Sequence, residues 1–438
     1  MGFLNSDKLI VGYDLTNEYS QISFAVSESE EAETLSQVAG SQKYNIPTVL
    51  CKRYGVNQWL YGREAIRGAD EDQGILVDNL LTLAMDGEPV LIDGESFDPV
   101  ALLALFFKRS LGLLSQAKAS SNPLAGLSEK RTILMITCPM MNREILDVLG
   151  SMVKGLHLKM DRVFFQSHAE SFYTYMLHQP KELWTAPSVL FDYGRNGIRV
   201  YRMECNRRTT PIVVFIEEEV YDFPVWEELP EGTEPEVGRQ EELDGAFSRI
   251  VETVCGGTQV GSAFLIGDGF AGGWMKNSLR LLCKGRRVFQ GNNLFSKGAC
   301  CGVQEQIMPS AMGKDYVFLG SDKLKANIGM KILRQGEDSY YALLDAGMNW
   351  YEAEQSMEFY IQNGNEIQLA ITPLIRSVKK TDKSVSIRLE GLQGTVARLR
   401  MRLFIKEERH LEVEVEDMGF GRFRGASGRV WRETVEIY

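Results

Sequence analysis

Three separated segments decide the fold: IVGYDLTNEYSQISF at 10–24, VLFDYGRNGIRVYRM at 189–203 and AFLIGDGFAGGW at 263–274. Each combines an apolar run, typical of a buried strand, with a turn rich in glycine or carboxylate side chains. Glycine turns let backbone N–H groups approach an anion, and aspartates at strand ends can orient a metal ion and its waters. The segments therefore predict an α/β domain whose ligand site lies where the strands end.

The composition is that of a folded protein with more than one domain. The chain has 438 residues, 44% of them hydrophobic and 24% charged, whereas one domain usually has about 100 to 200 residues. The net charge of -11 argues against nucleic acid or an anionic membrane as the main partner, because either polyanion would repel the chain. Neither a membrane-spanning apolar run nor a signal pattern is present, which predicts a cytoplasmic protein.

The cysteines and histidines predict neither a disulfide framework nor a protein-held metal. Seven cysteines are present, an odd number, and none forms a CxxC pair, so a zinc site is not indicated. The four histidines, at 157, 168, 178 and 410, have no metal-ligand spacing. Catalysis by a metal ion held by protein ligands alone is therefore not expected.

The N-terminal part alternates strands and helices. Period-two apolar residues predict hairpins over 8–24 and over 46–65, the second closed by Tyr54 and Gly55. A helix is predicted over 97–114, with Asp98 as N-cap and Pro99 at its first position. A strand–helix–strand–helix unit follows, with elements at 132–139, 142–155, 162–166 and 169–178.

An acidic stretch separates the last two of the opening segments. Twelve acidic residues and one arginine lie between Glu217 and Asp244, with three prolines among them. Such a composition buries little surface and repels itself, which predicts an exposed loop, either a solvated linker or a docking segment. A helix is predicted over 241–255.

From about Lys325 onward, strands with period two dominate. The clearest pair is 397–405 against 411–417. With a turn near Glu408, the register places Arg400 and Arg402 opposite Glu416 and Glu414, and it places Met401, Leu403 and Ile405 opposite Val415, Val413 and Leu411. The sequence thus predicts an antiparallel β domain with one face exposed to water.

The order of six segments resembles that of the seventy-kilodalton heat-shock chaperones of the DnaK type, within the actin-like superfamily. The resemblance spans nearly the whole chain, although no single motif in it is strong. The segments that carry it are VGYDLTNEYSQISF, IPTVLCKRYGVNQWLYGREA, ITCPMMNREILDVLGSMVKGLHLKMDRVFFQSHAESFYTYML, FDYGRNGIRVYRM, SAFLIGDGFAGGWMKNSLRLLCKGRRVFQGNNLFSKGACCGVQ and KDYVFLGSDKLKANIGMKI.

The resemblance implies an α/β fold: a two-lobed actin-like, ribonuclease H-like nucleotide-binding domain followed by an antiparallel β-sandwich domain. It implies a first lobe over 1–187, a second lobe with a returning helix over 188–312, a linker over 313–324 and the β domain over 325–438. The chain stops at Tyr438, where the helical lid of these chaperones would follow.

The resemblance also implies a nucleotide cleft. It places ten residues at the first phosphate turn, the second phosphate turn and the adenosine segment, with ATP or ADP and magnesium as ligands and Asp14 and Asp192 as the metal-orienting pair. These residues are Asp14, Thr16, Asn17, Asp192, Gly194, Arg195, Gly197, Gly267, Gly269 and Gly272. Two plainer interpretations stay open: the aspartates form turns at strand ends, and the glycines of 267–273 serve only close packing.

The departures from the chaperone pattern concern the reactive groups. Ile66 stands where the family has its catalytic lysine, and Ser167 stands where it has a glutamate. Glu18 adds a negative charge beside the first turn, and Arg195 and Asn196 replace two glycines of the second turn. Loss of each charge-stabilising group typically lowers a rate by a factor of about 100 or more, so no residue is assigned as catalytic.

The sequence therefore predicts a bacterial, chaperone-like protein whose nucleotide-binding domain is degenerate. Its β domain is expected to bind an unidentified protein or extended peptide, with little or no ATP hydrolysis. The prediction includes both a chain that binds ATP or ADP with magnesium and a chain without any cofactor. One alternative is a working magnesium-dependent ATPase in which Arg195 stabilises developing charge. The other is a non-enzymatic actin-like scaffold.

Overall fold

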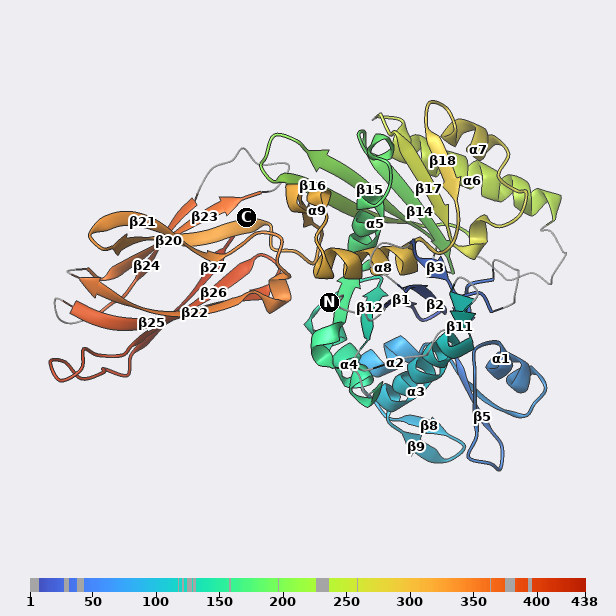
Figure 1. Ribbon diagram of the computed structural model, residues 1–438, viewed down its shortest axis with the longest axis horizontal. Helices are drawn as coiled ribbons and strands as arrows, with labels where there is room; N and C mark the ends of the chain where they lie inside the picture. Colours follow the sequence, from blue (N-terminus) through green and yellow to red (C-terminus); the bar gives the residue numbers. More distant parts are fainter. Residues whose placement is uncertain are drawn as a thin grey trace, which may run out of the picture. The chain divides into compact units, whose positions relative to one another are not determined.

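The computed structural model describes residues 8–26, 31–37, 43–116, 118–119, 122–123, 128, 131–156, 159–195, 197–225, 236–257, 259–362, 364–374, 383–392 and 396–438. It divides the chain into two compact units, Met1–Val317 and Phe318–Tyr438 (Figure 1). The division falls inside the predicted linker, 313–324. No helix in the described ranges is long and apolar enough to cross a membrane.

The first unit is a mixed α/β structure built on two large sheets. The first of these has the order β13-β12-β1-β2-β3. β1 pairs antiparallel with β2 and parallel with β12, and β12 pairs parallel with β13. Both β1 and β12 are buried along their whole length, as their continuous apolar runs require of strands covered on both faces. The strands are β1 (Leu9–Leu15), β2 (Tyr19–Ala25), β3 (Glu33–Thr34), β12 (Thr132–Cys138) and β13 (Val163–Ser167).

The second sheet repeats this plan. Its strands follow the order β18-β17-β14-β15-β16-β19, with an antiparallel hairpin β14-β15, antiparallel β16 beside it, and parallel β17 and β18 on the other side. The order and direction of β18, β17, β14, β15 and β16 match those of β13, β12, β1, β2 and β3 in the first sheet. The strands are β14 (Ser188–Gly194), β15 (Gly197–Asn206), β16 (Ile212–Tyr221), β17 (Ser262–Ile266) and β18 (Arg287–Gln290).

Smaller elements complete the first unit. β6-β5-β7 form a three-stranded sheet, β8 and β9 form a hairpin, β10 pairs with β11, and β4 pairs with β2. β19 (Tyr316–Leu319) spans the boundary between the units. The other elements are β4 (Ile46–Pro47), β5 (Leu50–Arg53), β6 (Trp59–Tyr61), β7 (Gly74–Val77), β8 (Val90–Ile92), β9 (Glu95–Phe97), β10 (Lys118–Ala119), β11 (Asn122–Pro123), α1 (Gly62–Asp70), α2 (Leu80–Asp86), α3 (Pro99–Gly112), α4 (Arg143–Val153), α6 (Val237–Cys255), α7 (Asn277–Leu282) and α9 (Ala311–Asp315).

Two helices, α5 (His168–Leu177) and α8 (Leu294–Ile307), pack against each other between the two sheets (Figure 1). α8 follows the second sheet in sequence but packs on β1 and β12 of the first. Conversely, α5 follows the first sheet, and its Phe172 ring lies 6.0 Å from the ring of Phe264 in β17 of the second. Each half of the unit therefore supplies a helix that contacts the sheet of the other half.

Glycines make this close packing possible. A Cβ atom at Gly298 of α8 would lie 2.0 Å from the backbone oxygen of Ser171 in α5, and one at Gly12 of β1 would lie 2.2 Å from the backbone oxygen of Ser296 in α8. Real Cβ atoms do not approach backbone this closely. The small residues of α8 therefore let its backbone touch both α5 and the first sheet.

Most elements predicted for the first unit are confirmed. Residues 8–24 form the β1-β2 hairpin, and the strands expected at 132–139 and 162–166 are β12 and β13. α3 begins as predicted, with the Asp98 side chain accepting a hydrogen bond from the N–H of Val100 and Pro99 at the first helical position. Helix capping of this kind can be predicted from the sequence because the residues that form the cap are neighbours in the chain.

Three predictions for the first unit are wrong. The hairpin expected over 46–65 ends at Tyr61, and Gly62 begins α1, whose buried face consists of Gly62, Ala65 and Gly68 at helical spacing. The expected acidic loop begins in the last residues of β16, where Glu218 pairs with Arg199 of β15 at 3.3 Å. α6 begins at Val237 rather than 241. The middle of the acidic stretch, 226–235, lies outside the described residues.

The second unit consists of two four-stranded antiparallel sheets, ordered β21-β20-β23-β24 and β22-β25-β26-β27. The inner faces share one hydrophobic core that draws Ile328 and Leu369 from the first sheet and Leu403 and Val413 from the second. The strands are β20 (Ala326–Arg334), β21 (Glu337–Leu344), β22 (Glu354–Gln362), β23 (Glu366–Pro373), β24 (Lys383–Arg388), β25 (Val396–Glu407), β26 (His410–Asp417) and β27 (Val430–Glu436).

The predicted register of β25 against β26 is confirmed. Arg400 pairs with Glu416 and Arg402 with Glu414, while Leu403 opposes Val413. The ion pairs extend further than the register alone indicates, because Arg402 contacts Glu354 of β22 at 2.7 Å. These pairs are solvent-exposed and each contributes little to stability, so the buried apolar face determines the register.

Candidate functional site

Two adjoining cavities lie beside the turns that follow β1 and β14. The larger, about 180 Å³, is here called the strand-end cavity; its lining includes Thr16, Asn17, Glu18, His168, Asp192 and Arg199. The smaller, about 70 Å³, is called the arginine cavity; its lining includes Glu18, Asn45, Arg63, Ile66, Arg195 and Asp268. Glu18, Tyr19 and Gly194 line both. The first two opening segments of sequence therefore meet here.

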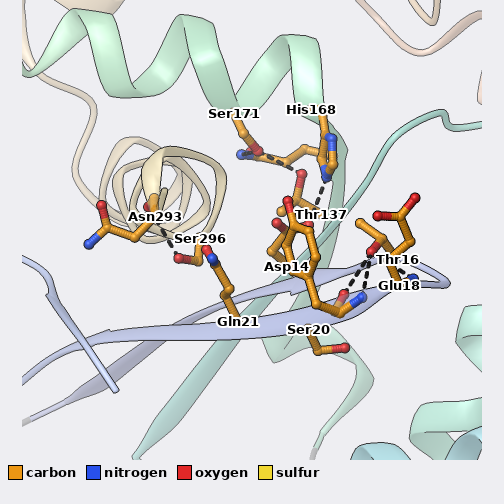
Figure 2. Close-up of polar contacts among 12 residues, drawn as sticks. Asp14, Thr16, Glu18, Ser20, Gln21, Thr137, His168, Ser171, Asn293 and Ser296 are labelled. Carbon is orange, nitrogen blue, oxygen red and sulfur yellow. Dashed lines mark hydrogen bonds and ion pairs between the residues drawn. The ribbon is translucent and has the colours of Figure 1, made fainter. Parts of the chain in front are cut away.

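A buried pair of side chains, Asp14 and His168, lies beside the strand-end cavity, and His168 lines it. Asp14, near the end of β1, accepts a 2.7 Å contact from Nε2 of His168, the first residue of α5. Both side chains are almost completely buried, and the imidazole stacks on the ring of Phe295 with centroids 3.8 Å apart. Figure 2 shows His168 pointing from the helix toward Asp14 on the strand. Asp14 is thus held by a side chain and is not simply a turn residue.

Asp192 lies at the equivalent position near the end of β14 and lines the strand-end cavity. Burial raises the pKa of Asp192 to about 7; the positive charge of His168 opposes this rise, and the negative charges of Asp14 and Glu18 add to it. The two aspartates predicted as a pair are therefore close enough to interact electrostatically.

The first predicted phosphate turn is engaged in its own hydrogen bonds. The Thr16 hydroxyl donates to the carbonyl of Tyr19 at 2.7 Å and accepts from the Tyr19 N–H. Asn17 caps α2, since its side-chain oxygen accepts from the N–H groups of Leu81 and Thr82. Both residues line the strand-end cavity, but these side chains already serve the turn and the neighbouring helix.

Glu18 reaches from the first turn to the second. Both of its carboxylate oxygens lie 3.2 Å from the backbone nitrogen of Arg195, which donates to them. Gly194 lies beside the Glu18 carboxylate, and a Cβ atom at Gly194 would lie 3.3 Å from it. Burial raises the pKa of Glu18, and the N–H group and charge of Arg195 act in the opposite direction. An N–H group of the predicted second phosphate turn is thus satisfied by the chain itself. The adjoining Asn196 lies outside the described residues.

The glycines of the predicted adenosine segment pack against Tyr193. A Cβ atom at Gly267 would lie 2.3 Å from the Tyr193 carbonyl oxygen, and one at Gly269 would lie 2.3 Å from the Tyr193 ring. Gly272 has a φ of +93°, and neither it nor the other two line the two cavities. Tyr193 itself packs in an aromatic cluster with Phe223, Phe247, Phe270 and Trp274. The close-packing interpretation of Gly267 and Gly269 therefore agrees with their contacts.

Asp268, between those glycines, is the part of that segment that lines the arginine cavity. Its carboxylate accepts a hydrogen bond from the side chain of Asn45 and another, at 3.4 Å, from Asn292. Asn45 precedes β4, which pairs with the first sheet. The Asn45–Asp268 contact and the Glu18–Arg195 contact therefore both join the side of the first sheet to the side of the second.

Ser167 and Ile66, which stand where the resemblance implies a glutamate and a catalytic lysine, have other roles in the structure. The Ser167 hydroxyl accepts from the N–H of Glu170 and caps α5. Ile66 lies on α1 and lines the arginine cavity, one helical turn after Arg63, which lines it too. Gly197, with a φ of +94°, brings its backbone against the carbonyl of Tyr221, 2.7 Å from where its Cβ would be.

Sequence reasoning missed His168, Arg63, Arg199 and Asp268. Their partners lie far away in the chain; His168 and Asp14, for example, are 154 residues apart. Arg63 could have been found from its spacing, since a residue three positions before Ile66 shares its helical face. For His168, which directly follows Ser167 at the end of β13, no sequence spacing indicates a partner.

The residues around these cavities do not fit a nucleotide with magnesium. Small-molecule sites usually enclose about 300 to 1,000 Å³, and these cavities enclose about 180 and 70 Å³. The N–H group of Arg195 is taken by Glu18, and the glycines expected near a base are covered by Tyr193. Across the described ranges, no group of three His, Cys, Asp or Glu side chains is arranged to hold a metal ion.

Comparison with known proteins identifies families without an assigned function. A family model described as "Family of unknown function (DUF5716) C-terminal" matches residues 31–321, and one described as "Domain of unknown function (DUF8552)" matches residues 323–437. No curated protein matches the chain. Because the first model covers more than half of the sequence, the chain belongs to the DUF5716 family.

Proposed function

We propose that this member of the DUF5716 family is a chaperone-like protein with a divergent actin-like body that works without ATP hydrolysis. Its second unit, in this proposal, binds an extended segment of another protein. The observation that carries the proposal is the Glu18 carboxylate, both of whose oxygens lie 3.2 Å from the Arg195 backbone nitrogen. A group of the chain stands where the resemblance implies a nucleotide phosphate.

The actin-like assignment is supported by the repeated sheets of the first unit. Each sheet has an antiparallel three-stranded part and two parallel strands in the same order, and each places an aspartate, Asp14 or Asp192, near the end of its first strand. The reciprocal packing of α5 and α8 supports it further. These features correspond to the two lobes and the returning helix that the sequence predicts.

Loss of nucleotide chemistry is supported by charge and by space. Glu18, Asp192 and Asp268 all line the two cavities, and their carboxylates would repel a polyphosphate. The Glu18–Arg195 and Asn45–Asp268 contacts join the two sides of the cleft without a ligand. The body is therefore proposed to keep its closed arrangement by itself.

Addition of MgATP or MgADP is expected to leave the unfolding temperature of the intact chain unchanged. A ligand at about 100 times its dissociation constant would stabilise the native state by roughly 2.7 kcal/mol, a shift that calorimetry resolves. Magnesium chloride alone serves as the control. A rise in the unfolding temperature with either nucleotide, or phosphate release above that of buffer, would favour the working-ATPase alternative instead.

The second unit offers an edge for a partner strand. β21 is the outer strand of its sheet; its Tyr340 is 54% exposed, and Leu333 of the neighbouring strand β20 is 74% exposed. Exposed edges with apolar side chains are the surfaces to which extended peptides add as a further strand. This edge is the proposed protein-binding element.

Binding of a labelled unfolded polypeptide, reduced and carboxymethylated α-lactalbumin, is expected to weaken about tenfold in Tyr340→Lys, because Tyr340 lies on the edge strand β21 and a charged side chain on an edge opposes strand addition. Fluorescence anisotropy measures the affinity. Tyr360→Lys, on the edge strand β22 of the other sheet and 62% exposed in the native protein, is the matched control. Absence of binding to the native chain, or equal weakening in both variants, argues for the scaffold alternative.

A further inference from the structure

Glu18 is placed as an acceptor on the second turn. Its two oxygens share the Arg195 N–H at equal distances of 3.2 Å, and its carboxylate lies against Gly194, which has no side chain to keep it away. The residue projects from the β1-β2 turn, which Thr16 fixes through three hydrogen bonds. The carboxylate is therefore delivered to the second turn by a rigid hairpin.

Two arginines lie at the same position. The exposed residues Arg63 and Arg195 both line the arginine cavity, together with Glu18 and a second acid, Asp268, whose carboxylate accepts hydrogen bonds from Asn45 and Asn292. Among the described residues, neither guanidinium takes part in an ion pair that would neutralise it. Two arginines and a backbone N–H group that face one small cavity are the groups with which proteins bind phosphate oxygens. The chemistry of an anion site is thus present around the Glu18 carboxylate.

We propose that Glu18 is a resident anion that fills a surviving phosphate-sized site made by the Arg195 N–H group and the guanidinium groups of Arg63 and Arg195. This rests on the proposed function, and it names the side chain that keeps phosphate compounds out. A tethered group acts at an effective concentration in the millimolar range or above. A free phosphate must therefore displace Glu18 or bind beside its charge, and both reduce its affinity.

Glu18→Ala is expected to bind inorganic pyrophosphate about tenfold or more tightly than the native chain, because a like charge at contact distance is removed. Titration calorimetry of the intact chain at low ionic strength gives both affinities. Glu64→Ala is the matched control, since Glu64 is an exposed acid on α1 and its removal changes the net charge equally. Adding Arg63→Ala to Glu18→Ala should return the affinity toward the native value.

Equal affinities for Glu18→Ala and Glu64→Ala would overturn the inference, and so would a native chain that binds pyrophosphate as tightly as Glu18→Ala. If Glu18→Ala does not fold, Glu18→Gln replaces it: this variant keeps the length of the side chain and removes its charge, and unchanged affinity in it counts against the inference. Tight binding of MgATP or MgADP by the native chain would instead refute the proposed function. The two failures are therefore distinguishable.

Discussion

Gly298→Ala is expected to destabilise the first unit by about 3 kcal/mol, in the range of overpacking changes in a tight core. The new methyl group would lie 2.0 Å from the backbone oxygen and 2.7 Å from the carbonyl carbon of Ser171, so α5 and α8 must separate. The contact cannot relax by a rotamer change, because both partners are backbone. Nearby, the Thr174 hydroxyl donates to the Gly298 carbonyl at 2.7 Å, and this bond is strained by the same displacement.

Gly150→Ala is the matched control for that variant. Gly150 lies within α4 and has open space where its Cβ would be. This substitution also replaces glycine by alanine inside a helix. It is expected to stabilise the fold by about 0.5 to 1 kcal/mol, because alanine loses less backbone freedom on folding than glycine and favours the helix more. Hydrogen exchange of α5 and α8 in the intact chain measures both effects. Similar stability of the two variants would show that the helices do not pack as described.

Asp417→Asn is expected to destabilise the second unit by about 3 kcal/mol, because removing one partner of a buried ion pair leaves the other uncompensated. Asp417 is 1% exposed and pairs with both terminal nitrogens of Arg424. It also accepts from the Ser427 hydroxyl at 2.6 Å and the Gly419 N–H at 2.9 Å. One carboxylate thus organises the whole connection between β26 and β27.

The Asp417 carboxylate also makes the stability of the second unit depend on pH. Burial alone would raise the pKa of Asp417, but the hydrogen bonds from Arg424, Ser427 and Gly419 lower it to about 2, from an ordinary value of 3.8. A carboxyl group whose pKa is lower in the native state than in the unfolded state stabilises the fold at any pH above its unfolded-state pKa. This stabilisation is lost as the pH falls toward its native-state pKa. The difference between the native chain and Asp417→Asn should therefore narrow between pH 4 and pH 2.

Hydrogen exchange of β26 and β27 in the intact chain provides the measurement. Glu416→Gln is the control, since the neighbouring acid forms a half-exposed pair with Arg400 and should change stability by less than about 1 kcal/mol. An Asp417→Asn chain as stable as Glu416→Gln at neutral pH would contradict the assignment of Asp417 as the organising group.

The parts of the fold that could be predicted from the sequence are those whose signals are local. The register of Arg400 against Glu416 follows from period two and one short turn, and the start of α3 follows from Asp98 and Pro99. The acidic end of β16 was missed because Glu217, Glu218 and Glu219 break the apolar alternation, although Glu218 has an arginine partner across the strand. The acidic composition predicts a loop there, whereas the pairing of Glu218 with Arg199 allows a strand.

The candidate site was only partly predictable for a different reason. The turns that carry Asp14 and Asp192 show themselves through strand and glycine patterns. The partners that decide what those turns do, His168 for Asp14 and the Arg195 N–H for Glu18, are 154 and 177 residues away in the chain. The sequence predicts that Glu18 is a negative charge that opposes phosphate, but no pattern in it indicates that the Glu18 carboxylate is itself bound at the second turn.

The exchange of α5 and α8 between the two sheets has a practical consequence for dissecting the protein. A fragment that ends after β13 and α5 would carry the first sheet without α8, which packs on β1 and β12, and would leave Ile10 and Met135 exposed on that face. A fragment that begins at β14 would contain α8 without β1 and β12, the strands on which α8 packs. Neither half should be obtainable as an autonomous piece, so genetic truncation between them would yield insoluble polypeptide rather than two working modules.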